Sequence, residues 1–210
     1  PHQHIGDDRF RYSEVGAGEP LVFVHGSASD LRTWAAQVES FAERYRAVTY
    51  SRRSHWPNDP IAPGADYSMA EHVADLRHLL EAWGATPAHL VGHSYGGFVC
   101  LLLALEAPGL VRTLTLVEPP VLTLFTSSTP TPRELVAVLV SRPRTGLALL
   151  RLGALGLGPA TAAVARGDME GAMRLFGRAA LGADAYRRLS EERRQQVREN
   201  LIPAEFLGSG

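Results

Sequence analysis

The chain has 210 residues, 45% of them hydrophobic, and a formal net charge of −1 at pH 7. This length and apolar content suffice for a domain with a buried core, and the near-neutral charge offers no attraction to nucleic acid or to an anionic membrane. The one cysteine, Cys100, excludes an internal disulfide framework and a cysteine metal cluster.

Nothing in the sequence resembles a targeting or anchoring segment. Pro1 to Asp8 is polar and lacks the apolar core of a signal peptide. No uninterrupted apolar stretch approaches the roughly 20 residues that cross a bilayer. We therefore expect a cytoplasmic protein with no membrane partner.

Short β-rich segments alternate with helical patterns over the first 118 residues, which is typical of a parallel sheet covered by helices. Arg9 to Val15 alternates in polarity and is expected at the edge of the sheet. The further expected strands are Leu21 to Val24, Arg46 to Tyr50, Leu90-Val91 and Val111 to Val117.

Helices are expected between these strands. Trp34 to Arg44 places Trp34, Val38 and Phe41 on one face. Ser68-Met69-Ala70-Glu71 is a capping box that opens a helix, and Gly84 closes it.

The composition changes after Pro119-Pro120. From Val121 to Phe206 no segment reads as a strand, and helical segments are broken by Pro and Gly: Pro132 to Val140, Thr145 to Leu155, Asp168 to Ala180 and Ser190 to Asn200. We interpret residues 1–120 as an α/β core, 121–207 as a helical lid, and 208–210 as the start of a return to the core.

The segment Leu90 to Gly97, followed by the apolar run Phe98 to Leu105, predicts the chemistry. A buried strand, a serine bracketed by Gly92 and Gly96, and a buried helix together form the pattern of a nucleophile elbow. The turn leaves no room for Cβ atoms at those glycines. The helix N-terminus favours a developing oxyanion. We predict that Ser94 is a nucleophile, against the alternative of an ordinary serine in a glycine-rich turn.

His25-Gly26-Ser27 follows the expected strand Leu21 to Val24, and with the elbow it resembles the α/β-hydrolase superfamily, in its serine-nucleophile, lid-bearing branch, over most of the chain. The resemblance implies a mostly parallel sheet flanked by helices, with a helical lid. It also implies an oxyanion hole formed by the backbone N–H groups of Ser27 and Tyr95. His25 is then a structural side chain that shapes the loop.

The segment after Tyr50 departs from the family pattern. Where many members carry Asp-x-Arg-Gly-His-Gly, this chain has Ser51 in place of the Asp, and Ser54 and Trp56 in place of the glycines. The segment either packs beneath the site or brings Arg53 and His55 to the substrate, because loops at the C-terminal ends of strands line ligand sites in such sheets.

Glu118 ends the strand Val111 to Val117, at the same edge as Ser94. Some members of the superfamily, among them the haloalkane dehalogenase branch and certain lactone hydrolases, carry their acid at this position. Glu118 is therefore a candidate for the acid that orients the base. The alternative is that it only caps the turn at Pro119-Pro120.

The base is missing, because residues 94 to 210 contain no histidine. In the family order the histidine comes last, after the final strand. We expect that the C-terminal strands are absent and that this 210-residue piece alone is inactive. Val111 to Val117 would then be an open apolar edge, which native proteins avoid. A missing C-terminal segment or a partner chain should pair with it.

The predicted function is a serine hydrolase that forms an acyl-enzyme on Ser94 from a carboxylic ester or a lactone. The leucine-rich lid, with Phe125, indicates that part of this small-molecule substrate is apolar. By the resemblance, a serine here argues against dehalogenase or epoxide hydrolase chemistry, which uses Asp. Carbon–carbon bond hydrolases, cofactor-free peroxidase-like enzymes and hydroxynitrile lyases remain open.

Two alternatives remain, a non-catalytic ligand-binding relative and one half of a two-chain hydrolase. No metal or organic cofactor is indicated, since the sequence has no His/Asp cluster at ligand spacing and no phosphate-binding glycine loop.

Overall fold

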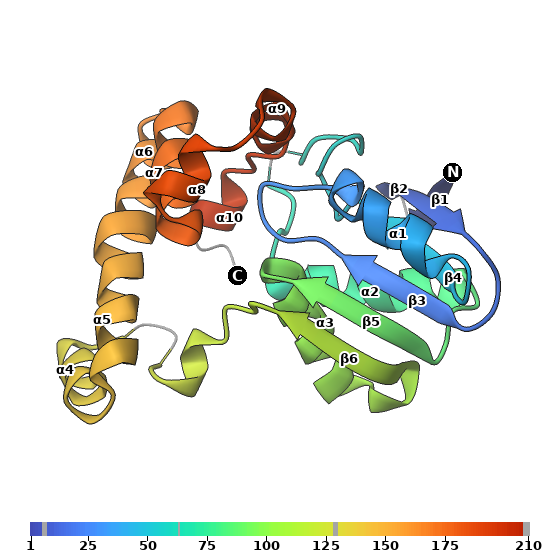
Figure 1. The fold of residues 1–210 in the computed structure, drawn as a ribbon, viewed down its shortest axis with the longest axis horizontal. Helices are drawn as coiled ribbons and strands as arrows, with labels where there is room; N and C mark the ends of the chain where they lie inside the picture. The colour runs from blue at the N-terminus through green and yellow to red at the C-terminus, as the bar shows by residue number, and fades with distance from the viewer. Residues whose placement is uncertain (6–7, 63, 128–129, 208–210) are drawn as a thin grey trace. The chain divides into compact units, whose positions relative to one another are not determined.

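A computed structural model of the chain describes residues 1–5, 8–62, 64–127 and 130–207. The chain forms two compact units, one that extends through Pro120 and one that begins at Val121 (Figure 1). The expected return to the core at 208–210 lies outside the described residues.

The first unit is built on a six-stranded sheet in the order β1-β2-β4-β3-β5-β6. Neighbours from β4 to β6 are parallel, while β1 and β2 are antiparallel to their neighbours. The strands are β1 (His2–Ile5), β2 (Asp8–Val15), β3 (Pro20–Val24), β4 (Arg46–Tyr50), β5 (Ala88–His93) and β6 (Val111–Val117). The α/β class and the mostly parallel sheet are as the sequence predicts.

The N-terminal edge differs from the expectation. The segment at Arg9 to Val15 is a strand, but β1 pairs outside it and takes the edge position. The sequence of β1, His-Gln-His-Ile, has no strand pattern of its own. Its conformation depends on pairing with β2, which local propensity does not report.

Each face of the sheet has its own core, because alternate residues of a strand point to opposite faces. Val22 and Val24 of β3 face α2 (Met69–Ala82) and α3 (Tyr95–Glu106). Leu21 and Phe23 face η1 (Leu31–Trp34) and α1 (Ala35–Phe41). Short turns complete the unit: η2 (Pro108–Leu110) precedes β6.

Helix α2 keeps half of the expected capping box. The Ser68 hydroxyl accepts from the Glu71 N–H at 3.4 Å. The Glu71 carboxylate lies 3.0 Å from the Arg53 guanidinium. Gly84 follows the helix at φ +58°, the left-handed conformation expected of a closing glycine.

The second unit is helical, and none of its described residues forms a strand. Its elements are η3 (Leu122–Leu124), α4 (Pro132–Ser141), α5 (Pro143–Arg151), the π-helical η4 (Leu152–Leu157), α6 (Gly158–Ala165), α7 (Met169–Leu181), α8 (Ala183–Arg187), α9 (Glu191–Glu199) and α10 (Ala204–Leu207).

The break expected after Leu155 is wrong, because helix continues from Pro143 to Ala165. The wider π turn precedes Pro159, which lacks an N–H to donate to the preceding turn.

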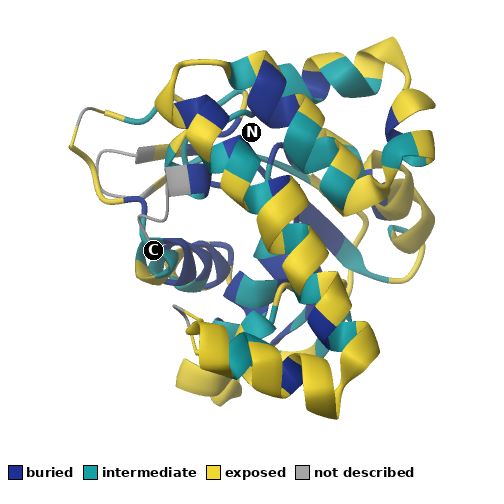
Figure 2. Cartoon of the chain, turned by 90° about the vertical axis from the view of Figure 1, so that its left-hand side faces the viewer, coloured by how far each residue is buried: buried dark blue, intermediate teal, exposed yellow. Residues whose placement is uncertain are grey.

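This continuous helix is unusually apolar and poorly covered. Its 23 residues include a window of mean hydropathy 1.6 of which 22% is buried. Exposed residues recur along the helices of this unit in Figure 2. By length and composition the helix could cross a bilayer, a test that the core helix of a soluble protein also passes.

Candidate active site

Ser27, Ser94 and Tyr95 follow the two strands at which the strand order reverses. The chain leaves β3 for α1 on one face of the sheet, and leaves the neighbouring β5 for α3 on the other face. Such a point in a parallel sheet opens a crevice at the C-terminal ends of the strands. The loops after β3 and β5 therefore border the most favourable ligand position of this fold.

Ser94 sits between β5 and α3 with φ +50° and ψ −122°. A residue with a Cβ is strained in this conformation, by about 1–3 kcal/mol. The close approach expected at the flanking glycines is present. A Cβ at Gly92 would lie 2.6 Å from the Gly96 carbonyl oxygen, and one at Gly96 would lie 2.3 Å from the His25 carbonyl oxygen.

The loop after β3 passes directly beside this serine. A Cβ at Gly26 would lie 3.0 Å from the Ser94 Cβ. Ser27 follows in the chain, and Tyr95 is the first residue of α3, where the helix dipole is positive. The structure thus brings the loop that carries Ser27 beside the turn that carries Ser94 and Tyr95.

Backbone strain is concentrated at this edge of the sheet. Among the described residues, four non-glycine residues have positive φ: Ala28, Ser54, Ser94 and Glu118, at +49°, +61°, +50° and +50°. They lie in the loops that follow β3, β4, β5 and β6, one in each. Strained residues of this kind cluster at functional sites.

Glu118 is the residue next to Ser94 across the sheet. His93 pairs with Val117, and the Ser94 N–H donates to the Val117 carbonyl at 2.9 Å. Neighbouring strands lie about 4.8 Å apart, so the two backbones run side by side at their ends. The Glu118 carboxylate is exposed and makes no hydrogen bond with any described residue, so no bond to the Pro119-Pro120 turn holds it.

His25 is fully buried and uses both ring nitrogens. Its Nε2 accepts from the Arg52 N–H at 2.9 Å, so the proton is on Nδ1, which donates to the Gly26 carbonyl at 2.8 Å. This is a structural side chain that shapes the loop.

His55 and Arg53 hold the loop after β4 together. His55 is fully buried, with Nε2 3.2 Å from Arg52 Nη2 and Nδ1 3.0 Å from the Arg53 carbonyl oxygen. The Arg53 guanidinium donates twice to the Asp75 carboxylate of α2, at 2.6 Å each. These contacts favour the packing interpretation of the loop over contact with substrate.

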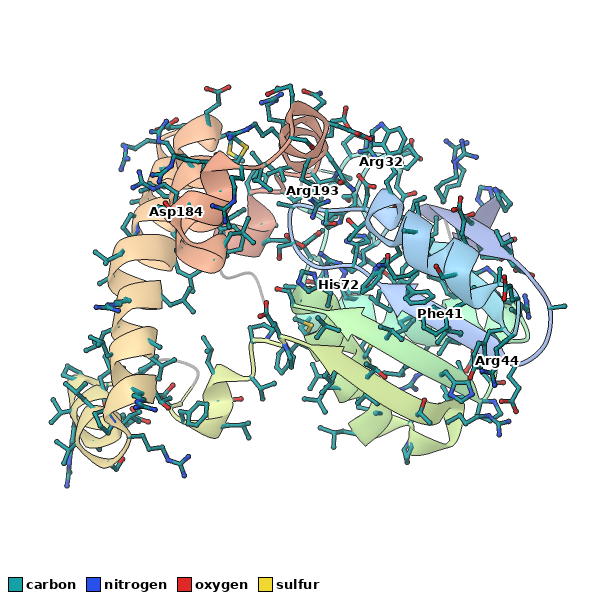
Figure 3. The ribbon with its side chains drawn as sticks, viewed as in Figure 1. Arg32, Phe41, Arg44, His72, Asp184 and Arg193 are labelled. Carbon is teal, nitrogen blue, oxygen red and sulfur yellow. The ribbon has the colours of Figure 1, made fainter. Side chains whose placement is uncertain are left out.

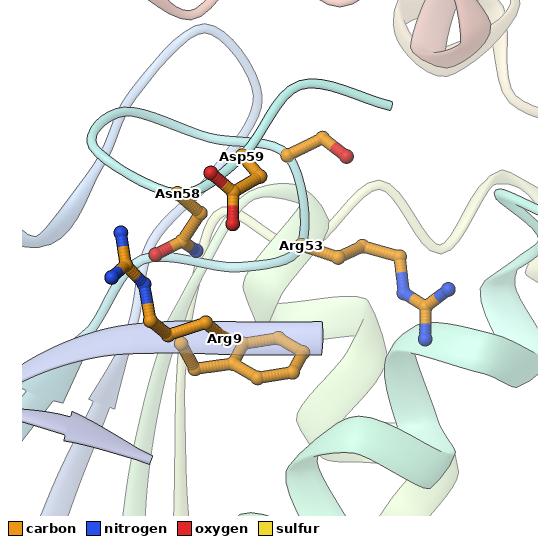
Figure 4. Close-up of a pocket in the computed structure, with 6 residues that line it drawn as sticks. Arg9, Arg53, Asn58 and Asp59 are labelled. Atoms are coloured by element: carbon orange, nitrogen blue, oxygen red, sulfur yellow. The ribbon is translucent and has the colours of Figure 1, made fainter. Parts of the chain in front are cut away.

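The cavity at this loop is small. Arg9, Phe10, Arg53, Ser54, Asn58 and Asp59 line about 20 Å³, room for one water molecule and not for a substrate. Figure 4 shows the Arg53 side chain leading away from Asn58 toward a helix.

Two further residues lie apart from this edge. Phe125 belongs to the second unit, where its ring lies 5.8 Å from the Arg142 guanidinium carbon. Cys100 is fully buried in α3, and burial raises the pKa of its thiol, so it stays a neutral core residue. The described residues contain no group of three His, Cys, Asp or Glu side chains placed to hold a metal ion.

Sequence reasoning missed Arg52. This residue is 1% exposed and contacts the loop after β3 and the residue after Ser94. Its pattern in the sequence, one of two adjacent arginines, gives no sign of burial.

Comparison with known proteins agrees with this geometry. Residues 19–154 match the sequence model of the α/β hydrolase fold. The chain belongs to the α/β-hydrolase fold family. A putative carbamate hydrolase, RutD, from Azorhizobium caulinodans is 34% identical over 119 residues, which are 56% of this chain and 44% of the relative. The chain thus matches less than half the length of that relative.

Solved structures show the same fold. An N-acyl homoserine lactone degrading enzyme is 22% identical with a TM-score of 0.61, over 100% of this chain and 68% of the other. A variant of an epoxide hydrolase from Bacillus megaterium is 17% identical with a TM-score of 0.71, over 100% of this chain and 70% of the other.

Proposed function

We propose that this chain carries the nucleophile and the oxyanion hole of a serine hydrolase that acts on carboxylic esters or lactones. The observation that carries the proposal is the strained backbone of Ser94 at the strand-order reversal, with Gly26 against its Cβ. An ordinary turn serine has no reason to hold this conformation.

In this mechanism Ser94 Oγ attacks the substrate carbonyl carbon and gives its proton to a histidine base. The carbonyl oxygen becomes an oxyanion held by the Ser27 and Tyr95 N–H groups, each worth about 3–4 kcal/mol of transition-state stabilisation. The tetrahedral intermediate expels the alcohol, which takes the proton from the histidine. Water, deprotonated by the same base, then hydrolyses the acyl-enzyme.

The chemistry of serine favours carbonyl substrates. A serine that opened an epoxide would become an ether, which water does not readily cleave, whereas an ester on Ser94 is hydrolysed. Two of the similar proteins are named for carbonyl compounds, a carbamate and a lactone.

The base comes from outside these 210 residues, since no histidine follows His93. Glu118 orients it, because Glu118 follows Val117, whose carbonyl accepts the Ser94 N–H, and its carboxylate makes no hydrogen bond with any described residue. A further strand, from a C-terminal segment or from a partner chain, pairs with β6, which ends the strand order and leaves Val117 38% exposed.

The substrate's acyl or ring portion is apolar. This proposal rests on the composition of residues 121–207, which are rich in leucine and include Phe125. Each buried CH₂ adds about 0.8 kcal/mol, so kcat/KM for p-nitrophenyl esters should rise about fourfold per CH₂ until the site is filled.

The test uses the full-length protein and a fluorophosphonate, which labels only an activated serine. Wild type should be labelled once, and Ser94→Ala should not be labelled. An unlabelled wild type contradicts the hydrolase proposal and favours a non-catalytic binding protein.

The role of Glu118 has its own test. Glu118→Gln should lower kcat by orders of magnitude while the free energy of unfolding stays nearly unchanged, since the side chain is exposed. Unchanged kinetics would place the acid elsewhere.

A further inference from the structure

Arg52 is a buried cation at the junction of three loops. It follows β4 by two residues and is 1% exposed. Its Nε donates to the His25 carbonyl and its Nη2 to the Gly26 carbonyl, both at 3.2 Å. Burying a guanidinium costs free energy unless its N–H groups are hydrogen-bonded. The two carbonyl bonds therefore offset part of the cost of burying Arg52.

We propose that Arg52 is a positioning residue that orients and polarises the Gly26–Ser27 peptide, whose N–H is one donor of the oxyanion hole. The inference rests on the proposed hydrolase function. It assigns Arg52 a role through that peptide and no contact with the substrate.

Orientation follows from peptide geometry. The Gly26–Ser27 bond is trans, so the Gly26 C=O and the Ser27 N–H are parts of one plane and point in opposite directions. Arg52 Nη2 and His25 Nδ1 both donate to this one carbonyl oxygen, at 3.2 and 2.8 Å. With the oxygen held on that side, the Ser27 N–H is fixed on the other.

Polarisation follows from the charge. A cationic donor on the carbonyl oxygen draws electron density from the amide and makes its N–H a stronger donor. Neutral His25 holds the same oxygen but carries no charge, since its Nε2 accepts from the Arg52 N–H. Only the positive charge of Arg52 therefore polarises the Gly26–Ser27 peptide in this way.

Arg52 also touches the residue that carries the second donor. Its guanidinium carbon lies 4.4 Å from the centre of the Tyr95 ring. His72 of α2, labelled in Figure 3, meets the same ring edge-on at 5.2 Å. One side chain thus links the loop after β3 to the elbow after β5.

His55 fixes the guanidinium in turn. Its Nε2 accepts from Arg52 Nη2 at 3.2 Å, and its ring packs edge-on against His25 at 4.7 Å. His55, which the sequence offered as a substrate-binding residue, thus holds Arg52 in place.

The test compares Arg52→Lys and Arg52→Met in the full-length protein. Arg46→Met is the matched control, since Arg46 is the first residue of β4 and its guanidinium bonds Glu14 and the Trp83 carbonyl. We measure kcat and KM for an ester and the inhibition constant of a trifluoromethyl ketone, which forms the oxyanion.

Arg52→Met should lower kcat by about 10- to 100-fold, below the roughly 100- to 1,000-fold loss caused by removing a whole oxyanion donor. KM should change little, and affinity for the ketone should fall by the same factor as kcat/KM. Arg52→Lys keeps the charge but lacks the fork that reaches two carbonyls, so its loss should be smaller. Arg46→Met should keep the wild-type kcat.

A second readout separates this inference from the hydrolase proposal and covers the case in which Arg52→Met fails to fold. The Ser27 amide proton, followed by NMR, should move upfield in Arg52→Lys and stay in place in Arg46→Met, whether or not the protein hydrolyses esters. An unmoved Ser27 amide, or a loss carried by KM alone, overturns the inference.

Discussion

The backbone of Ser94 makes a quantitative prediction that needs no substrate. Glycine adopts φ +50° without strain, and alanine does not. Strain relief is worth about 1–3 kcal/mol, and the greater freedom of glycine in the unfolded chain costs about 0.4–1 kcal/mol. Both substitutions remove a hydroxyl that bonds no described side chain. Ser94→Gly should therefore be more stable than Ser94→Ala by about 1.3 kcal/mol, the difference between the midpoints of these ranges.

Urea unfolding followed by tryptophan fluorescence measures this difference in the right part of the chain. All three tryptophans, Trp34, Trp56 and Trp83, belong to the first unit. Ser40 is the control position, since it is an exposed residue in the last turn of α1. There the order should reverse, with Ser40→Ala more stable than Ser40→Gly by about 0.5–1 kcal/mol.

Equal stability of Ser94→Ala and Ser94→Gly, with the Ser40 pair as expected, would contradict backbone strain at Ser94. That result would mean that Ser94 relaxes to an ordinary conformation. The elbow would then give no sign of a nucleophile, and the strongest support for the proposed hydrolase would be lost.

Three further predictions concern the packing and the charges. Gly96→Ala should destabilise by about 3 kcal/mol or more because its Cβ meets backbone oxygens, while Gly109→Ala, with open space, should lie within about 0.5 kcal/mol of wild type in the same assay. Arg53→Met should cost about 3 kcal/mol by removing the guanidinium that donates twice to the buried Asp75 carboxylate; an increase in KM with unchanged stability would instead support substrate contact. Hydrogen bonds from Thr131 and Ser127 at the start of α4 lower the pKa of Glu134 to about 2. The ionised Glu134 carboxylate should therefore stabilise the folded protein fully above pH 4.5, and this stabilisation should be lost as the pH falls toward 2. A carboxyl NMR titration midpoint near pH 4.5 would contradict this.

Local signals in the sequence predicted the elements that depend on local physics. The buried strand at Leu21 to Val24, the helix cap at Ser68 and the glycines around Ser94 each act through a few neighbouring residues. The strand β1 and the continuous helix through Pro159 were missed, because a pairing partner and a π turn decide them. Phe41, expected on the buried face of α1 and labelled in Figure 3, is 44% exposed.

The loop after β4 shows why the structure is needed to interpret residues that depart from a family pattern. Ser54 stands where the pattern has glycine, and its φ of +61° is the conformation that glycine adopts freely. The Ser51 hydroxyl donates to the Trp56 carbonyl at 2.7 Å. The loop of this chain thus holds a glycine-like conformation at Ser54, at the cost of strain there.

The strand order explains why the contacts of Arg52 could not be predicted from the sequence. In the chain, Arg52 lies 42 positions before Ser94, with α2 and β5 between them. In the sheet, β3 separates β4 from β5, so the loop after β4 reaches the elbow only across the loop after β3. Arg52 joins the three loops by bonding the His25 and Gly26 carbonyls and packing on the Tyr95 ring, which a long cation with several donors can do while buried. The order of the strands therefore gives the buried arginine its position, and no spacing along the chain records that order.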